Sequence, residues 1–570
     1  MYTAIKKAAG FVLAAAVCCS ASAIAPEKVK PVKNVILFIS DGTSLSVASA
    51  ARWLQRYRDP AKEHLNLDPW MCGTVVTCNS DAPIGDSAPT TSCYMTGHRS
   101  RAGYVSTYPP YKGSANIGFV DSTRAYAPMA TLLEAGKQLL GKSAGLVFTC
   151  QFPHATPADC SAHYYNRNAS GVISDQMVHN GLDVVIGGGC GYLNSDNEAY
   201  LRSQGVNVYR DDISGMRSDK GSKMWALFDQ EDMDYDMDRD PAQQPSLEEM
   251  TRTAIGKLSR NSKGFFLMVE GSKVDWAAHA NDPGAVVNEF LAFDKAVGAA
   301  LEFARKDGNT AVIITVDHGN SGFSISRRDI ADYSLASLER LFGQVNKYKK
   351  SSDGLEEIIN AQPFDSLKSI FRKYASIELT KDEELLLMNS RGYKNSPVPE
   401  ELRAPDKTSP LYSSYLSGVI TKILTAHTCF GWTTGGHTGE EVMLACYHPK
   451  ADQRIMGVNS NVDLAHYLQA LFGMYGKMQK FSDNIFARHT DVFSGYEVDL
   501  QRNPKAKERP TLVVRNAANG KTLTIRPFTN TIEVADGKSA PRSVQLASVV
   551  TYVDRNDMFY LPADLAKYLK

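Results

Sequence analysis

Five short apolar runs, rich in β-branched residues, constrain the fold of this chain most strongly. Short runs of this kind, bounded by turn residues, are typical of buried strands. Stretches with a helical pattern, such as residues 285–305, lie between them. The alternation predicts an α/β fold with a mostly parallel central sheet sandwiched by helices. The runs are residues 35–39, 144–148, 183–186, 265–269 and 311–316.

This pattern extends over residues 30–485 and is interrupted once. Residues from about 325 to 430 are charged and have a helical pattern, so we expect an inserted helical subdomain. From residue 486 to 570, short strand-like runs return and a helical pattern closes the chain over residues 561–569. This end predicts a separate small C-terminal α+β module, whose role the sequence leaves open.

The N-terminus has the features of an export signal. Two lysines precede an apolar run over residues 8–17, and small residues at 21–23 offer a cleavage site, so residues 1–25 read as the signal. The run is too short to cross a bilayer as a helix. We expect an exported, periplasmic or extracellular protein without a transmembrane segment, with lipid anchoring at Cys18 or Cys19 as a minor alternative.

Charge and cysteine content narrow the function classes. Lysine plus arginine and aspartate plus glutamate both number 62, so no basic excess favours a nucleic-acid partner. Of the ten cysteines, eight follow the signal, and export permits disulfides. The sequence does not choose among their many pairings. No C-x-x-C pair is present, which disfavours a zinc ribbon.

Acidic residues and a histidine follow the fourth apolar run. Glu270 comes directly after it, and a helix that begins near Ser272 would place Asp275 and His279 on one face. Ligands bind at the carboxyl ends of parallel strands, so these side chains are candidates for a divalent-metal site. On its own, a capping carboxylate with an ordinary helix histidine explains the segment about as well.

Two other strand ends favour the metal site. Asp41 follows the first run, and Asp317 and His318 follow the last. His437 lies in a Gly-Gly-His-Thr-Gly stretch, whose glycines let the backbone approach a ligand. A single aspartate at a strand end is most often a turn residue, but three such ends indicate a cluster. Mixed aspartate and histidine ligands favour zinc, and all-oxygen ligands favour magnesium.

Two further segments supply candidate catalytic groups. Ser87 lies just before a predicted helix, where the N-terminus favours a developing alkoxide, although a plain N-cap is the commoner role. Pro89 is tolerated in the first turn. Thr156 can provide a hydroxyl ligand at the start of another helix, or merely cap it. Arg167 follows about three helical turns later and could bind phosphate oxygens, although most helix arginines are solvated.

With these residues in place, the chain resembles the alkaline phosphatase family. The match covers about residues 33–478 apart from the insertion, with the motifs in family order. The resemblance implies a secreted hydrolase of phosphate monoesters with two Zn²⁺ ions, one Mg²⁺ ion and a phosphoserine intermediate at Ser87. The matching segments are "NVILFISDGTS", "DSAPTTSCYMTG", "HATPADCSAHYYNR", "FFLMVEGSKVDWAAH", "VDHG" and "GGHTGEE".

The resemblance also implies roles for single residues. Arg167 would clamp the phosphate, and the second zinc would touch Ser87. His154, Trp276 and Asp86 would lie beside the metals. The pair of His154 and Trp276 leaves the occupant of the third metal site open. The implied ligands are Asp275, His279 and His437 for the first zinc, Asp317, His318 and one oxygen of Asp41 for the second, and the other oxygen of Asp41 with Glu270 and Thr156 for the magnesium.

Two classes of function compete with phosphomonoester hydrolysis at this stage. A phosphodiesterase or a sulfatase of the same superfamily is one class, but "DSAPTT" lacks the arginine that sulfatases need after their nucleophile. Arg167 favours a monoester, whose additional non-bridging oxygens it can bind. A catalytically silent phosphate-binding surface protein is disfavoured by the intact Ser87 and the complete ligand set. The sequence leaves open the physiological substrate and a homodimeric assembly.

Overall fold

The computed structural model describes residues 24–394, 414–537 and 539–570. Nearly all of the export signal expected at residues 1–25, including Cys18 and Cys19, lies outside the described residues. Within the described ranges, no helix combines the length and the apolar character needed to cross a membrane.

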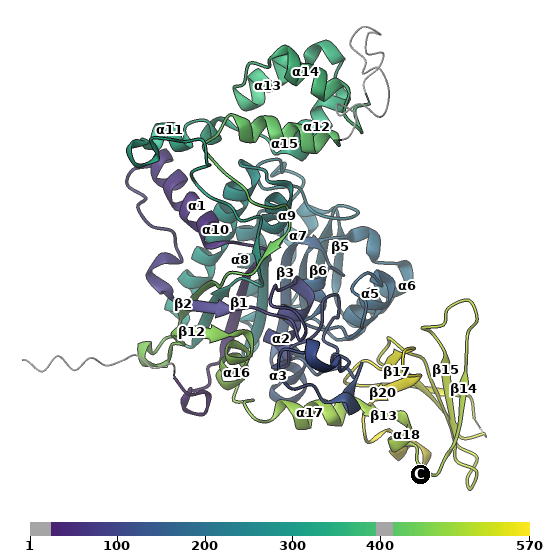
Figure 1. Cartoon of the computed structure of the whole chain (residues 1–570). Coiled ribbons are helices and arrows are strands. Elements are labelled where there is room, and N and C mark those ends of the chain that lie inside the picture. The colour runs from purple at the N-terminus through teal and green to yellow at the C-terminus, as the bar shows by residue number, and fades with distance from the viewer. Residues whose placement is uncertain (1–23, 395–413, 538) are drawn as a thin grey trace, which may run out of the picture.

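A ten-stranded sheet runs through the centre of the described chain (Figure 1). All of its strands are parallel to one another except β11, which runs antiparallel to both of its neighbours. The five predicted strands form β1, β3, β4, β7 and β8, and the predicted fold class is confirmed. In order across the sheet the strands are β12 (Gly457–Ser460), β2 (Met71–Val76), β11 (Val442–Tyr447), β8 (Thr310–Thr315), β1 (Asn34–Ser40), β7 (Phe265–Gly271), β3 (Ser143–Gln151), β4 (Val184–Gly188), β6 (Met224–Phe228) and β5 (Asn207–Arg210).

Helices cover both faces of this sheet (Figure 1). The apolar side chains of the central strands are buried, because every residue of β1, β7 and β8 lies between two helical layers. The covering helices are α1 (Leu45–Arg58), α2 (Ser87–Thr96), α3 (Leu132–Leu140), α8 (Leu247–Leu258), α10 (Ala285–Asp307) and α16 (Asn461–Leu471). Shorter or peripheral helices are α4 (Ala155–Ala158), α5 (Ser170–His179), α6 (Ser195–Ser203), α7 (Ile213–Ser218), α9 (Lys273–Ala280), α17 (Met478–Ile485) and α18 (His489–Val492).

The register of the central strands brings their polar ends to one level. Ile39 of β1 pairs with Glu270 of β7 on one side and with Thr315 of β8 on the other. The chain segments that leave these strands therefore begin at the same edge of the sheet. A short antiparallel ribbon, β9 (Gly319–Asn320) with β10 (His437–Thr438), lies at this edge and pairs Asn320 with the histidine of β10.

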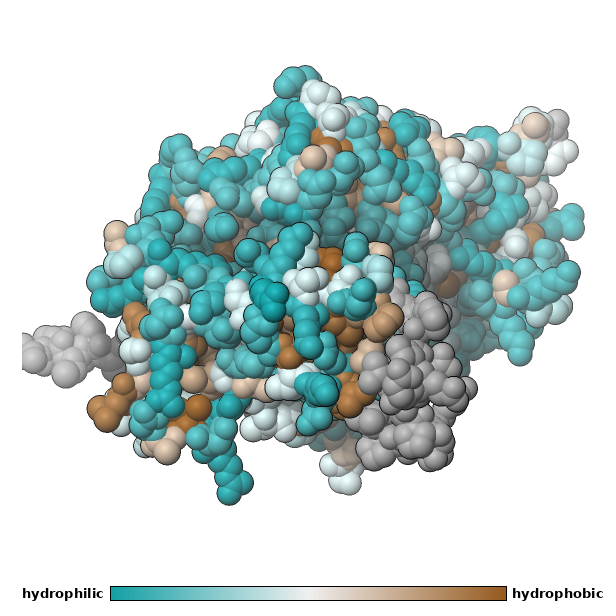
Figure 2. Space-filling view, turned by 90° about the horizontal axis from the view of Figure 1, so that it is seen from above, coloured by the Kyte–Doolittle hydropathy of each residue, from teal (hydrophilic) through white to brown (hydrophobic). Residues whose placement is uncertain are grey.

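The helical insertion leaves the main domain after α11 (Leu338–Phe342), which packs against α1. Phe342 still belongs to the main core, whereas Tyr348 and the helices after it have a small core of their own. Figure 1 shows these helices as a separate layer above the edge of the sheet, and Figure 2 shows that this face of the molecule is mainly hydrophilic. The helices are α12 (Ser352–Ala361), α13 (Leu367–Ala375), α14 (Lys381–Met388) and α15 (Leu416–Ala426).

The C-terminal module contains an antiparallel five-stranded sheet and a three-stranded sheet. The helix expected over residues 561–569 is wrong in its first half: Leu561 ends β20, Pro562 follows, and only Leu565–Leu569 form a 3₁₀ turn. Proline lacks the backbone N–H that would continue the hydrogen bonds of a strand or of an α-helix. The strands are β14 (Glu497–Gln501), β15 (Thr511–Arg515), β16 (Thr522–Ile525), β17 (Thr531–Ala535) and β18 (Arg542–Gln545), and then β13 (Ala487–Arg488), β20 (Met558–Leu561) and β19 (Thr551–Val553).

Candidate active site

Ser87 lies at the start of α2, against the ends of β1 and β8. Its Oγ is 3.3 Å from Nε2 of His318 and 3.4 Å from Oδ1 of Asp41. The Nε2 of His318 also lies 3.5 Å from Oδ2 of Asp317. The helix continues with Pro89 in its first turn, where no N–H is required, and ends at Gly97 in the left-handed region. The hydroxyl thus sits at a helix N-terminus that faces an acidic and imidazole cluster.

Three histidines of the cluster point their Nε2 atoms inward. Each Nδ1 lies within 3.2 Å of a backbone carbonyl, of Gly435 for His279, of Gly85 for His437 and of Gly319 for His318. An Nδ1–H that donates to a carbonyl leaves the lone pair on Nε2. The Nε2 atoms of His279 and His437 then face each other at 3.2 Å, an arrangement of two acceptors that a shared cation satisfies.

Asp275 is placed by α9 and by the ribbon. Its Oδ1 accepts a hydrogen bond of 2.7 Å from Nδ2 of Asn320, and its Oδ2 lies 3.4 Å from Nε2 of His279. Burial opposes ionisation of this carboxyl, but the hydrogen bond with His279 and the nearby imidazoles of His318 and His437 together outweigh burial and lower the pKa of Asp275. The same hydrogen bond raises the pKa of His279 to about 9.

Four buried oxygen atoms around the cluster have no hydrogen-bond partner among the described residues. Burial and the neighbouring carboxyl groups raise the pKa of Asp41, and burial raises that of Glu270 to about 8. Crowded acids with unused oxygens are costly in a dry interior unless a cation neutralises them. The donors therefore fit divalent cations. The four atoms are Oδ2 of Asp41, Oδ2 of Asp317, Oε1 of Glu270 and Oγ1 of Thr156.

Two groups of potential metal ligands overlap with the predicted zinc sites, one completely and one with His318 in place of His279. Asp41, Asp317 and His318 form one group, and Asp275, His318 and His437 form another, each with its ligand atoms within 4.8 Å of one another. His279 joins the second group through its contacts with Asp275 and His437. The structure therefore brings together the residues that the sequence placed around two cations.

Arg167 reaches this site from a loop, so its expected position on a helix is wrong. Helix α4 ends at Ala158, and the backbone N–H of Arg167 donates to the carbonyl of Gly103. One Nη1–H donates to Oδ1 of Asp86 at 2.8 Å, next to the nucleophile, and this ion pair lowers the pKa of Asp86 against the effect of burial. Its Nη2 lies 3.1 Å from Nε2 of His154, so Asp86 and His154 together hold the guanidinium beside Ser87. Its remaining N–H groups can be offered to a ligand.

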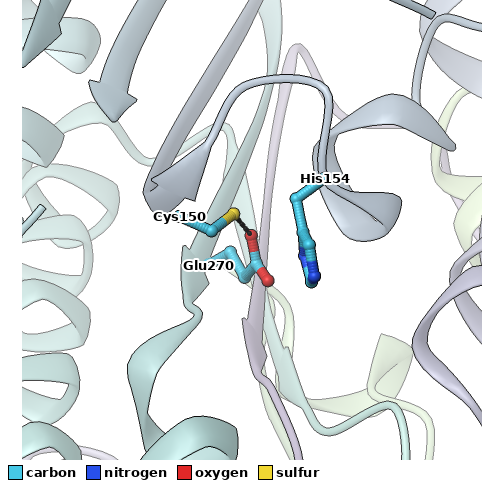
Figure 3. A group of neighbouring side chains, drawn as sticks. All are labelled: Cys150, His154 and Glu270. Carbon is cyan, nitrogen blue, oxygen red and sulfur yellow. Dashed lines mark hydrogen bonds between the residues drawn. The ribbon is translucent and has the colours of Figure 1, made fainter. Parts of the chain in front are cut away.

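A third group of side chains lies beside the first two (Figure 3). It joins Cys150 at the end of β3, Glu270 at the end of β7 and His154 at the start of α4. The sequence predicted Glu270 and His154 here but treated Cys150 only as a disulfide candidate. Its position at the carboxyl end of a predicted strand was the available clue. All eight described cysteines are unpaired thiols, and burial followed by the proximity of Glu270 raises the pKa of Cys150.

Other predicted or overlooked residues surround the cluster. Trp276 packs edge-on against His154, with ring centres 5.9 Å apart, and receives the ammonium of Lys273 over its face. Burial lowers the pKa of His154 to about 3. His163 is buried away from the ligands, between Glu134 and the carbonyl of Ser106, as a packing residue. Asn320, which orients Asp275, was not predicted because its side-chain contact depends on the ribbon.

Comparisons with known proteins agree with this arrangement. The family model described as alkaline phosphatase matches residues 32–474. Alkaline phosphatase 3 of Bacillus subtilis (strain 168) is 30% identical over 446 residues, which cover 76% of this chain and 87% of that protein.

Solved structures share the fold. The cold-active alkaline phosphatase of a psychrophilic Shewanella species superimposes with a TM-score of 0.64 at 23% identity, covering 77% of this chain and 99% of that one. A variant of the alkaline phosphatase from the Antarctic bacterium TAB5, with Mg bound in its M3 site, gives a TM-score of 0.51 at 23% identity and covers 78% of this chain and 99% of that one.

Proposed function

The chain belongs to the alkaline phosphatase family and is a phosphomonoesterase, and we propose that it hydrolyses small phosphate monoesters through a phosphoserine at Ser87. The observation that carries this proposal is the position of the Ser87 hydroxyl. It lies at a helix N-terminus, within 3.4 Å of both His318 and Asp41, with the Arg167 guanidinium held nearby by Asp86. A nucleophile, cation ligands and a phosphate clamp therefore converge on one point.

Two zinc ions would be held by the residues of the first two groups. The first would use Asp275, His279 and His437, and the second Asp317, His318 and one oxygen of Asp41. When bound, they would supply the positive charge that favours an alkoxide and stabilises the attacking and leaving oxygens. The unpartnered oxygens and the facing Nε2 atoms support this assignment.

The residues of the chain perform the bond changes. Ser87 Oγ gives up its proton to solvent and attacks phosphorus while the bond to the leaving oxygen breaks. The leaving oxygen takes up a proton from solvent, so the alcohol is released and phosphate stays on the serine. Water then attacks the same phosphorus, Ser87 Oγ departs, and inorganic phosphate is released. The N-terminus of α2 stabilises negative charge on Oγ in both steps.

Arg167 selects a monoester over a diester. A monoester at alkaline pH is a dianion with three non-bridging oxygens, and the planar guanidinium can donate to two of them. A diester replaces one of these oxygens with a bulky group and carries less charge. The Arg167 guanidinium therefore binds a diester less favourably and also clashes with its second substituent.

For a third cation, the sequence implies Mg²⁺ with Glu270, Thr156 and the other oxygen of Asp41. Support comes from the unpartnered atoms of all three side chains and from the TAB5 variant with Mg in its M3 site. We further propose export of the protein, on the N-terminal signal pattern, and a homodimer as its assembly. The helical insertion at about 325–430 is proposed to shape access to the site, and residues 486–570 to form an appended module.

The test compares three p-nitrophenyl substrates, the phosphate monoester, the bis-ester and the sulfate, with the purified protein. We expect release of p-nitrophenol from the monoester to dominate. Acid quenching with labelled phosphate should then place the label on Ser87. A preference for the bis-ester or the sulfate, or label on a different residue, would refute the proposed substrate class or the nucleophile respectively.

A further inference from the structure

The thiol of Cys150 is aimed at Glu270. Its Sγ lies 3.4 Å from Oε2 of the carboxyl, and both side chains are fully buried (Figure 3). The contact is built from two elements, because the hydroxyl of Ser272 accepts hydrogen bonds from the backbone N–H groups of Thr149 and Cys150. The end of β3 is thereby fastened to the start of α9, and the thiol has a fixed position relative to β7.

Other ligand atoms at the same place are unused. Oε1 of Glu270 and Oγ1 of Thr156 are buried without a hydrogen-bond partner in the described chain, and both residues are fully inaccessible to solvent. One nitrogen of His154, the sulfur of Cys150 and a carboxylate oxygen of Glu270 lie within 4.8 Å of one another. Buried ligand atoms without a partner, close to a sulfur atom, favour a cation site over an ordinary packed core.

The composition of this donor set differs from that of a magnesium site. Mg²⁺ requires oxygen ligands in near-octahedral geometry and has little affinity for sulfur. Thiolate and imidazole donors select Zn²⁺ and similar thiophilic cations. A serine in place of Cys150 would give a hydroxyl that suits Mg²⁺, so the sulfur atom is the feature that changes the preference.

We propose that Cys150 is a ligand of the third cation and that this site of the chain takes Zn²⁺ in preference to Mg²⁺. The proposal deepens the proposed function, on which the existence of a third cation site rests. Binding exchanges the thiol proton for the metal: the S–H bond breaks, a sulfur–zinc bond forms, and one proton is released to solvent. The alternative is a neutral thiol that only donates to Glu270 while the cation binds oxygen.

The experiment uses the full chain loaded with Co²⁺ and, separately, with Zn²⁺ in the presence of excess Mg²⁺. A cobalt–thiolate pair absorbs in the near ultraviolet, whereas the residues of the first two sites offer only oxygen and nitrogen. We expect such a band in the unmodified protein and zinc at about three equivalents per chain. Cys150→Ser should abolish the band, lower zinc to about two equivalents, and weaken zinc binding at the third site by at least about tenfold.

Cys446→Ser is the matched control, because Cys446 is also a fully buried strand cysteine and contacts Tyr467 instead of a ligand. It should keep both the band and the zinc content. If Cys150→Ser does not fold, X-ray absorption of the unmodified zinc protein decides, since a zinc–sulfur distance of about 2.3 Å is expected. Absence of both the band and this distance overturns the proposal.

Failure of this inference is distinguishable from failure of the proposed function. A protein that hydrolyses phosphate monoesters through Ser87 but shows no cobalt–thiolate band retains its function and loses the sulfur ligand. A protein that shows the band but transfers no phosphate to Ser87 retains the sulfur ligand and loses the proposed mechanism. The spectra and metal contents do not depend on turnover.

Discussion

A Cβ atom on Gly42 would lie 1.9 Å from Oδ1 of Asp275, which no real contact allows. Gly42 has a φ of +57°, and its N–H donates to Oδ1 of Asp317 at 3.0 Å. One residue without a side chain thus lets Asp275 of α9 and Asp317, which follows β8, approach the same backbone. Glycine is required here both for the left-handed conformation and for the space.

Gly42→Ala should therefore remove metal ligation more than it reduces stability. The methyl group displaces the carboxyl of Asp275, and we expect zinc content and phosphatase activity to fall together, with activity lower by at least about 100-fold. Gly308→Ala is the control, because Gly308 also has a positive φ, of +67°, but nothing lies within 4 Å of its Cβ position. Elemental analysis of both variants checks this, and full zinc content in Gly42→Ala would contradict it.

Ser87→Ala should lose most of the activity and all acid-stable phosphate label. Without the hydroxyl no phosphoserine forms, so kcat should fall by about a thousandfold or more, and water activated in the site accounts for the remainder. Zinc content should stay unchanged, since Ser87 is not among the proposed primary ligands. Label that persists in this variant would show that another residue carries the phosphate.

Arg167→Ser should reduce hydrolysis of the monoester far more than that of the diester. Loss of a charge-assisted pair in this polar site costs about 2–4 kcal/mol of transition-state stabilisation. At about 1.36 kcal/mol per decade, kcat/KM for the monoester falls roughly 30- to 1000-fold. Arg202→Ser, at an exposed pair with Glu198, is the control and should change neither substrate. An unchanged ratio between matched p-nitrophenyl mono- and diesters would refute the clamp.

Glu270 and His279 should each contribute less stability to the metal-free protein as the pH rises. Glu270 has a pKa of about 8 in the fold and about 4.5 in an unfolded chain, so the folded state binds more protons across this window and stability falls with pH. His279, raised to about 9, contributes stability that is complete below about pH 6.5 and is lost as the pH rises through about 9. Both effects have the same sign.

Urea unfolding of chelated protein at about pH 5.5 and about pH 8.5 measures this difference. Added zinc should stabilise the protein more at the higher pH, because the ligands must be deprotonated to bind it. Glu270→Gln should flatten the lower part of the pH dependence. Buried histidines with a lowered pKa, such as His154, change the stability in the opposite direction, so Glu270 is judged by comparing the unmodified protein with Glu270→Gln. An equal change of stability between the two pH values in both proteins would contradict the expected protonation of Glu270.

Removal of the helical insertion should change substrate access more than metal binding. The removed segment should include α15 as well as α12, α13 and α14, because these helices share one core and a deletion that kept α15 would expose its apolar face. We expect a flexible Gly/Ser linker in place of residues 350–425 to alter KM while the zinc content is kept. Asp282 loses its bond from Ser352 but still accepts two N–H groups at the start of α10. A folded variant without zinc would contradict the proposed role.

The features that sequence reasoning identified depend on short-range pattern. Apolar runs predict the central strands, and parallel register then places Asp41 and Asp317 together at one edge. Features that depend on distant contacts could not be placed. Asp159, just after α4, is held by the hydroxyl of Ser92 and the N–H of Ser106, contacts that lie outside the local pattern. Cys150 meets Glu270 across 120 residues of chain, and no local pattern encodes that distance.

The β9–β10 ribbon determines when the proposed first zinc site, which needs His437, can first exist during synthesis. His318 is made before the insertion and His437 after it, and the ribbon that joins their segments cannot form until the whole insertion has been translated. Closing so long a loop costs only about 0.6 kcal/mol more for each doubling of its length. The insertion therefore delays formation of the site but has little effect on the metal affinity of the finished site. A nascent or truncated chain that lacks His437 cannot complete the first of the two proposed zinc sites, so a cation held there reports that translation has passed this point.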